Sequence, residues 1–520
     1  MEKLVMFFLA ILPILWLILS LSGMKLAAYK ACPIALLLTV VLALTVWKFS
    51  PLNTLTAGLE GAAMALWPII LVIIAAVFTY NLSVKTGNMD LIKEMLTGVT
   101  TDRRILVLII AWGFGGFLEG MAGFGTAVAI PASMLIALGF DPMFSAAVCL
   151  VANATPTAFG SIGIPTTTVA QIAGLNAGTL SRATALQLFP LVILTPFILV
   201  MMTRGSEKRP FRGVGITALV SGLSFAVPEL AVASTVGAEL PVIVGSICSM
   251  ICTILCGRAQ TRRNPVPAFQ VEGTTTENRR SLSFGRALVA WLPFVLIFAL
   301  LTLTSSLVPP VHNALSAIKT SVRIYTGEGA APYTFTWINT PGVLILIAAL
   351  IGGAVQGAGL GEMLRVLGAT IRQMSKTIIT MLAVLSTAKI MGYSGMIAAI
   401  AGMMVGVSQA FYPLFAPLIG SLGAFITGSA TSSSVLFGKL QTEAAGAIGV
   451  NRYWLAASNT VGATAGKMIS PQNIAIAVAA TNLAGKEGKL LNSTIRYFVL
   501  FVVLMGLIVY FGASLTGVLF

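Results

Sequence analysis

The sequence predicts an all-α polytopic membrane protein with about 12 transmembrane helices and two re-entrant hairpins, arranged as two inverted repeats with broken helices. Three observations lead to this fold class. Only 9% of the 520 residues are charged and 57% are hydrophobic, whereas about a quarter of a soluble domain is charged. Many apolar runs approach the roughly 20 residues needed to cross a bilayer. Polar, glycine-rich interruptions of such runs recur in the same order in both halves of the chain.

The composition excludes several other classes of protein. The apolar segments are continuous rather than alternating, which excludes an outer-membrane barrel. The net charge of +15 comes from short basic clusters between apolar segments, as membrane topology requires, so no nucleic-acid partner is expected. The chain has no nucleophile–His–Asp set, Walker loop or dinucleotide fingerprint in context. We therefore expect neither an enzyme nor an ATP-driven pump, and no cofactor.

A metal site is not expected either. Cys248, Cys252 and Cys256 recur every four residues on one apolar helix, and no His or carboxylate joins them. We interpret them as buried small residues rather than metal ligands. His312 is the single histidine and falls in a predicted outer loop, where a metal or catalytic role is not expected.

The first half of the chain alternates plain spans with two interrupted segments. A charged, amphipathic stretch from 85 to 104 is placed at the membrane interface. Residues 105–138 form two short apolar arms that meet at residues 123–126. Neither arm is a comfortable span, so a re-entrant hairpin is predicted. A long helix with a glycine- and proline-rich break follows at 143–175. The plain spans of this half are predicted at 4–22, 31–48, 58–83 and 186–202.

The connection between the two halves sets the topology. Loops 203–212 and 257–286 are the most basic of the chain, and the positive-inside rule places both in the cytoplasm. Two helices between them cross outward and back, and a third leads to a long polar outer loop, 308–340. These helices are predicted at 213–230, 239–256 and 285–307.

The second half repeats the first, with a hairpin at 411–440 and a broken helix at 450–482. The stretch 392–410 is apolar enough to span, but its first-half counterpart is amphipathic, so we assign it the same interfacial role. When the spans are counted through the membrane in this way, the two halves have opposite orientations. The two hairpins then enter the membrane from opposite faces. The plain spans are predicted at 341–358, 362–391 and 494–515. The predicted domains are the first transmembrane helix (1–30), repeat 1 (31–202), the connecting helices with the basic cytoplasmic loop (203–340) and repeat 2 (341–520).

The interruptions share matched positions. Secondary transporters place such polar, glycine-rich breaks at a binding site near the middle of the membrane, so the pattern predicts a secondary transporter. Asn153, Gly160 and Pro165 recur 306 positions later as Asn459, Gly466 and Pro471, while Gly123 and Thr126 recur 305 positions later as Gly428 and Thr431.

The hairpin tips and helix breaks are the predicted substrate site. Backbone groups freed at such points are tolerated in a membrane only around a polar cavity, and helix N-termini there attract anions. The alternative is that the small residues only permit tight helix packing. The candidate binding residues are Gly123, Phe124, Gly125, Thr126, Asn153, Ser161, Gly428, Ser429, Thr431, Ser432, Ser433, Asn459, Lys467, Ser470 and Gln472.

Charges within the predicted spans are few, and each costs about 2.5–3.5 kcal/mol at the bilayer centre by insertion scales. Lys467 falls at the second break, where Ser161 stands in the first. It is the candidate anchor for one substrate carboxylate, the alternative being a lysine paired with a structural carboxylate. Glu119 begins the descent of the first hairpin and is the main candidate for proton coupling, against a structural role. Glu60 is the second candidate, unless it snorkels to the interface.

At these residues the chain resembles the bacterial lactate permease family. The matching segments are LEGMAGFGTAVAIP (118–131), ANATPTAFGSIGIP (152–165), TGSATSSSVLFGKLQ (427–441) and GKMISPQNIAIA (466–477). The resemblance implies a fold of inverted repeats with two hairpins and two broken helices, often assembled as a homodimer in the bacterial cytoplasmic membrane. It also implies that the hairpin tips and the two breaks line the substrate site.

The resemblance further implies import of L-lactate, and often D-lactate and glycolate, together with protons. Some family members carry an acidic residue where this chain has Ala430, so proton coupling here is expected to fall to another residue such as Glu119. A sodium-coupled anion transporter or a cation/proton exchanger of similar architecture remains the alternative. Beyond substrate, protons and membrane lipid, only a homodimer partner is expected.

Overall fold

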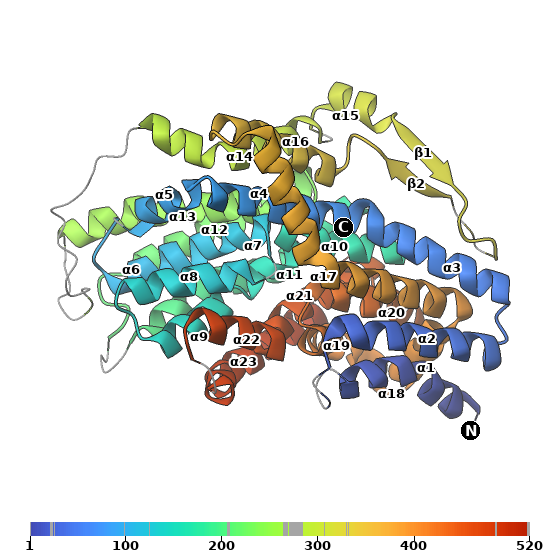
Figure 1. The fold of residues 1–520 in the computed structure, drawn as a ribbon. Coiled ribbons are helices and arrows are strands. Elements are labelled where there is room, and N and C mark those ends of the chain that lie inside the picture. The colour runs from blue at the N-terminus through green and yellow to red at the C-terminus, as the bar shows by residue number, and fades with distance from the viewer. Residues whose placement is uncertain are drawn as a thin grey trace.

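The computed structural model is nearly all helical, and most of its helices run roughly alongside one another (Figure 1). The long outer loop lies at the upper right of that view, outside the helical layers. The structure describes residues 2–20, 24, 26–97, 99–123, 125–204, 209–263, 269, 284–305, 307–328, 330, 332–483 and 486–516.

The helices of the first half begin in the predicted order. α3 and α4 form one 35-residue span with a break between them, where the backbone of Trp67 leaves the helical region. The predicted interfacial stretch forms the amphipathic helix α5. The bounds are α1 Glu2–Ile18, α2 Ala28–Thr45, α3 Pro51–Met64, η2 Ala65–Ile70, α4 Leu71–Lys85 and α5 Asn88–Thr97.

The first hairpin has unequal arms. Its first arm, Arg103–Met121, is 19 residues long and wholly buried, so the expectation that neither arm could span is wrong for this arm. The second arm has only 12 residues, and the chain turns sharply between the two, which keeps the hairpin shape. The bounds are α6 Arg103–Val107, η3 Leu108–Phe114, α7 Gly115–Met121 and α8 Thr126–Ala137.

The segment predicted as the first broken helix is bent at a break, and its role as one broken span stays a prediction. α9 and the helices after it are long and apolar enough to span only when taken together, and they are bent by 48° at the break. A plain span and the connecting helices follow. The bounds are α9 Pro142–Ala152, η4 Thr155–Phe159, α10 Gly160–Ala173, α11 Ala177–Met202, α12 Gly215–Thr235, α13 Pro241–Arg263 and α14 Phe284–Leu303.

The outer loop contains secondary structure that the all-α prediction lacks. A short helix, α15 (Pro309–Ser316), precedes β1 (Lys319–Val322) and β2 (Tyr333–Thr336). The strands pair antiparallel, with Lys319 opposite Thr336. Aromatic residues alternate with threonine in β2, and β1 contains threonine and valine; these residue types favour a pleated strand.

In the second half, α19 and α20 meet at Gly428 and Ser429, and α21 and α22 meet at Ser470; the re-entrant hairpin and the broken span stay predictions. α18 has 13 residues, which extend about 20 Å and are too short to cross a membrane. The bounds are α16 Pro341–Val355, α17 Leu360–Ser394, α18 Met396–Ser408, η7 Gln409–Phe411, α19 Tyr412–Thr427, α20 Ala430–Ile448, α21 Arg452–Ile469, α22 Pro471–Ala480 and α23 Glu487–Ala513.

Nine helices among the described residues are long and apolar enough to span a membrane, or ten when the bent pair is counted as one. Five shorter apolar helices, including α8, α16, α18 and most of α19, accompany them. The count of about 12 therefore stays a prediction, whereas the all-helical multi-pass class is confirmed.

The two halves exchange packing partners. α2 packs on α17 while α16 packs on α4, and α10 packs on α20 while α22 packs on α8. In the same way α11 contacts α21 and α23 contacts α9. For example, α2 corresponds to α16 and α4 to α17 in the predicted repeats. Each element therefore packs on an element of the other half that corresponds to its own neighbour in the chain. This interlocking brings both hairpins and both helix breaks together; the domain boundaries and the inversion of the repeats stay predictions.

Candidate functional site

The two hairpin tips meet the same short helix. Gly125 begins α8 with a left-handed backbone (φ 85°), and a methyl group there would lie 2.7 Å from Ile476 of α22. Gly428, also left-handed at φ 70°, lies against Gln472 at the start of α22. Only glycine adopts this conformation without strain. The tips therefore approach each other around α22, as a shared site requires.

The first helix break lies against the first hairpin tip. Ser161, Ile162 and Gly163 are all left-handed, a conformation that costs roughly 1–2 kcal/mol for a residue with a side chain. The Ser161 hydroxyl donates to the Ala122 carbonyl at 3.1 Å. At the tip, the Thr126 hydroxyl donates to the Gly123 carbonyl at 2.8 Å. These bonds hold the break and the tip as one unit.

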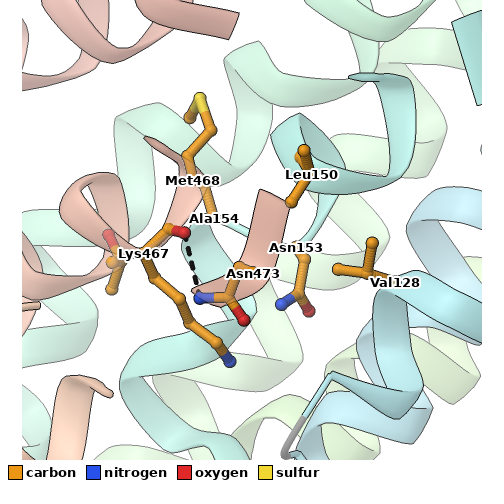
Figure 2. A pocket seen from close by; sticks show the side chains of 8 residues that line it. Val128, Leu150, Asn153, Ala154, Lys467, Met468 and Asn473 are labelled. Carbon is orange, nitrogen blue, oxygen red and sulfur yellow. Dashed lines mark hydrogen bonds between the residues drawn. The ribbon is translucent and has the colours of Figure 1, made fainter. Parts of the chain in front are cut away.

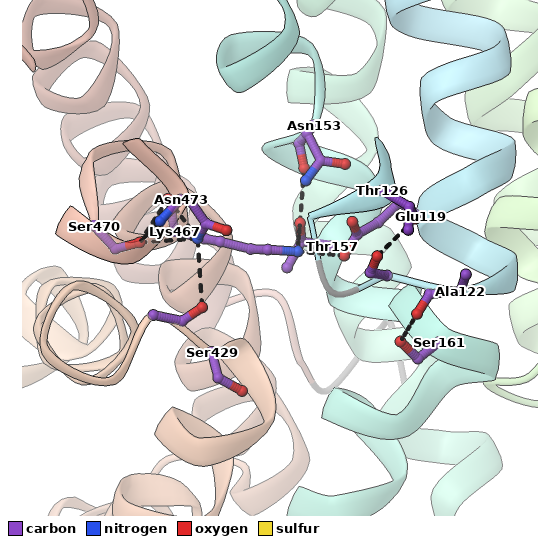
Figure 3. A network of polar contacts seen from close by, with 12 residues as sticks. Glu119, Ala122, Thr126, Asn153, Thr157, Ser161, Ser429, Lys467, Ser470 and Asn473 are labelled. Atoms are coloured by element: carbon purple, nitrogen blue, oxygen red, sulfur yellow. Dashed lines mark hydrogen bonds and ion pairs between the residues drawn. The ribbon is translucent and has the colours of Figure 1, made fainter. Parts of the chain in front are cut away.

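A buried ion pair joins the two halves beside this unit. Lys467 extends from α21 to Glu119 of α7 and Thr157 of η4 (Figure 3). Its ammonium lies 2.5 Å from Glu119 Oε1 and 3.4 Å from the Thr157 hydroxyl. Glu119 is 2% exposed and Lys467 8%. The second carboxylate oxygen of Glu119 is buried without a hydrogen-bond partner among the described residues, so it can accept a further hydrogen bond.

Glycine leaves the space for this carboxylate. A methyl group on Gly160, at the first break, would lie 2.6 Å from Glu119 Oε1. The backbone of Gly160 itself is extended, at φ −63° and ψ 156°, and suits any residue. The glycine is therefore required by the close approach of Glu119 and not by backbone conformation.

A small pocket opens between the first hairpin and the two helix breaks (Figure 2). It is narrow and has no room for a molecule the size of water. Lys467 and Asn153 provide its main polar side chains, together with Asn473. The lining residues are Val128, Leu150, Asn153, Ala154, Thr464, Lys467, Met468 and Asn473.

The second break is held by side chains of α22. Ser470 caps this helix by accepting a hydrogen bond from the Asn473 backbone N–H at 3.3 Å. The Asn473 amide donates to the Lys467 carbonyl at 3.1 Å and to the Ser470 hydroxyl at 2.8 Å. The carbonyl freed where α21 ends is thus satisfied, and the backbone that carries Lys467 is fixed.

The second hairpin contributes less to the pocket than predicted. The Ser433 hydroxyl donates to Gly420 O at 2.7 Å, and the Asn459 amide donates to Ser433 O at 3.3 Å. Both side chains are fully buried between α19, α20 and α21 and take part in packing. Ser429 caps α20 through the Ser432 N–H. None of the lining residues comes from the tip formed by Gly428, Ser429, Thr431, Ser432 and Ser433.

Two further predicted residues, Gln472 and Glu60, lie apart from the pocket. Gln472 is exposed beside Gly428. Phe124 lies outside the described residues. Glu60 is buried elsewhere, between α3 and α17, where it pairs with Lys389 at 2.7 Å and accepts a hydrogen bond from Tyr393 at 2.8 Å. It therefore does not snorkel, and it forms a second buried ion pair.

Sequence reasoning missed Asn473, Thr157 and Lys389. Asn473 lies within the second break segment, two positions after Pro471, and could have been found there as an amide beside a break. Thr157 follows Asn153 by one helical turn, which placed it on the same side of the first break. No local signal joins Lys389 to Glu60. Among the described residues, no three His, Cys, Asp or Glu side chains gather as a metal site would require.

Comparison with known proteins decides the family. The model of the L-lactate permease family matches residues 6–516. The chain belongs to the L-lactate permease family. The L-lactate permease of Streptococcus iniae is 50% identical over 86% of this chain and 93% of its own length. The L-lactate permease of Escherichia coli K12 is 35% identical over 96% of this chain and 94% of its own length. The glycolate permease of the same strain is 34% identical over 98% of this chain and 96% of its own length.

Solved structures show the same fold at low identity. The YdaH transporter of Alcanivorax borkumensis superimposes with a TM-score of 0.52 at 14% identity, over 94% of this chain and 99% of its own. Neisseria gonorrhoeae MtrF gives a TM-score of 0.52 at 12% identity, over 96% and 97%. This permease family member is therefore a multi-pass protein of the bacterial cytoplasmic membrane with a transporter fold.

Proposed function

We propose that this permease imports L-lactate and related small 2-hydroxymonocarboxylates, namely D-lactate and glycolate, together with protons and by alternating access. The names of its relatives support the substrate class. The observation that carries the coupling mechanism is the buried Glu119–Lys467 ion pair at the edge of the pocket. The only covalent bond that this mechanism makes or breaks is the O–H bond of the transferred proton.

Charge balance couples the two substrates. A buried site tolerates little net charge, because an uncompensated ion loses several kcal/mol of hydration. Without substrate, Lys467 is neutralised by Glu119. A carboxylate that binds Lys467 would bring two negative charges to one positive charge unless Glu119 takes up a proton. Protonation of Glu119 releases Lys467 for the substrate, and the site carries no net charge in either state.

The pocket offers groups for both ends of a 2-hydroxyacid. Lys467 would pair with the carboxylate, since charge-assisted hydrogen bonds are the stronger ones. Asn153 Oδ1 is buried without a hydrogen-bond partner among the described residues, and its amide can both donate and accept. We assign it to the substrate hydroxyl. Asn459, the other predicted candidate, is packed away from the pocket.

The narrow pocket supports alternating access. Because the space beside Lys467 is too narrow for a water molecule, substrate can reach it only after a hairpin tip moves away from α22. Gly125 of the first tip lies against Ile476 of α22, and Gly428 of the second lies against Gln472. Withdrawal of one tip or the other would open the site to one side of the membrane at a time.

Labelled L-lactate uptake into proteoliposomes tests the proposal. With an inward proton gradient, accumulation should exceed the external concentration and should be inhibited by D-lactate and glycolate. Accumulation that follows a sodium gradient instead would favour a sodium-coupled carrier, and equilibration without accumulation would contradict proton symport. A homodimer, expected from the resemblance, stays a prediction.

A further inference from the structure

A second cluster of buried charges lies between α3, α17 and α20. Glu60 of α3 is 3% exposed and pairs with Lys389 of α17 at 2.7 Å. The Tyr393 hydroxyl donates to the same carboxylate oxygen at 2.8 Å. Lys389 and Lys439 of α20 both lie over the Tyr393 ring, at 5.4 and 5.7 Å from its centre. One aromatic ring thus joins three elements, including an arm of the second hairpin.

The cluster contains one more cation than it contains anions. Glu60 neutralises Lys389, while Lys439 donates only to the Gly392 carbonyl, at 3.3 Å, among the contacts of the described residues. An ammonium has three donors. Glu443 lies one turn further along α20 and attracts the Lys439 ammonium electrostatically. It is exposed, however, and forms no ion pair with Lys439 in the described part of the chain. The half-buried Lys439 ammonium therefore has one hydrogen-bond acceptor among the described residues for its three donors.

The cluster also has one spare acceptor. Glu60 Oε2 is buried and has no hydrogen-bond partner among the described residues. Tyr325 covers the cluster from the outer loop, stacked on Tyr393 at 3.8 Å with the rings 12° apart. Burial first, and then Glu328 and Glu60, raise the pKa of Tyr325, so it stays neutral and does not offset the excess charge.

Helix packing does not require these charges. α3–α4 and α17 run past each other in opposite directions, so that residues near 60 meet residues near 389 and residues near 81 meet residues near 370. At the second meeting point Asn81 donates to Thr370 at 2.9 Å and to Gln373 at 3.0 Å. Hydrogen bonds between neutral side chains therefore connect α4 to α17 at that point. The charges at the first meeting point therefore need another explanation.

We propose that this cluster is a second binding site for the same small 2-hydroxymonocarboxylates, on the side of the protein covered by the outer loop. The substrate carboxylate pairs with Lys439, and its 2-hydroxyl donates to Glu60 Oε2. One bound anion neutralises the excess ammonium and supplies the missing donor. The site holds substrate before it reaches the pocket at Lys467. The inference rests on the proposed function for the identity of the anion.

Equilibrium binding of labelled L-lactate to the purified full-length protein in detergent tests this site. The unmodified protein should bind two molecules per chain, Lys439→Gln one, and Lys439→Arg two, because arginine retains the charge. Lys376→Gln, an exposed lysine of α17, is the matched control and should bind two. In proteoliposomes, Lys439→Gln should raise the KM for uptake about tenfold with little change in kcat, as loss of one charge-assisted contact predicts.

The outcomes separate this site from the pocket. Lys467→Gln should still bind one L-lactate, and propionate, which lacks the hydroxyl, should compete poorly for it. A single site in the unmodified protein that survives Lys439→Gln would overturn the second site and leave the proposed function intact. A fall in kcat with unchanged stoichiometry would show that Lys439 is only structural. No lactate binding at all would overturn the proposed function as well.

Discussion

Lys467 and Glu119, 348 positions apart in the chain, form one buried ion pair of 2.5 Å that joins α21 to the first hairpin. Sequence analysis gave these two residues separate roles, as substrate anchor and proton carrier. Their contact makes the two roles mutually dependent, because the carboxylate of Glu119 and that of a substrate compete for the same ammonium.

Glu119→Gln should separate exchange from accumulation. Glutamine cannot release a proton, and it leaves Lys467 free for a substrate carboxylate. The variant should therefore exchange labelled for unlabelled L-lactate across proteoliposome membranes, but it should not concentrate L-lactate when an inward proton gradient is imposed. Proton-driven accumulation at the unmodified level would exclude Glu119 as the coupling residue.

Single and double replacements of the pair should show strong coupling in stability. Removal of one partner of a buried ion pair costs about 3–5 kcal/mol, whereas removal of both leaves no uncompensated charge. Lys467→Gln and Glu119→Gln should each lower the Tm in detergent, and the double variant should recover much of the loss without recovering uptake. Additive effects in this double-mutant cycle would mean that the pair is not formed in solution.

Gly160→Ala should impair uptake through one contact. The added methyl group would lie 2.6 Å from Glu119 Oε1 and must displace that carboxylate from Lys467, while the backbone at this position accepts alanine. Uptake of labelled L-lactate should fall by at least tenfold. Gly446→Ala on α20 is the control, because nothing lies within 4 Å of its added methyl group; equal activity of the two variants would contradict this account.

Ser470→Ala should destabilise the second break. The change removes the cap of α22 and one partner of Asn473, and loss of such a cap costs about 0.5–2 kcal/mol. Thermal unfolding in detergent should begin at a lower temperature than in Ser234→Ala, whose exposed hydroxyl bonds only within its own helix. An unchanged Tm in Ser470→Ala would show that the cap does not support the break.

Local patterns predicted those parts of the fold that depend on nearby residues. Runs of apolar residues located the spans, and glycine with proline located the breaks at 160–165 and 466–471. The outer strands were missed because Lys319–Val322 and Tyr333–Thr336 are only four residues each, within a loop otherwise read as polar. The bounds of the first hairpin arm were predicted to within about two residues of the observed Arg103–Met121, although the arm was not expected to span.

The site could be predicted by residue type but not by partner. Lys467 and Glu119 stood out because charges are rare in apolar segments, yet nothing within either segment encodes their contact. The same holds for Glu60 and Lys389, which are 329 positions apart. Repeat matching also predicted a symmetric site, whereas the pocket uses Asn153 from the first break and Lys467 from the second. Asn459 is committed to packing because Gly420 allows α19 to approach its carbonyl closely.

Proton uptake on substrate binding tests the shared ion pair most directly. L-lactate is added to the purified protein in weakly buffered detergent solution, and the pH change is recorded alongside the binding isotherm. We predict uptake of about one proton per lactate bound at the pocket, with affinity that falls about tenfold per unit rise in pH because each lactate binds together with one proton, and neither effect in Glu119→Gln. Lactate binding to the unmodified protein without proton uptake, or the same uptake in Glu119→Gln, would contradict the account.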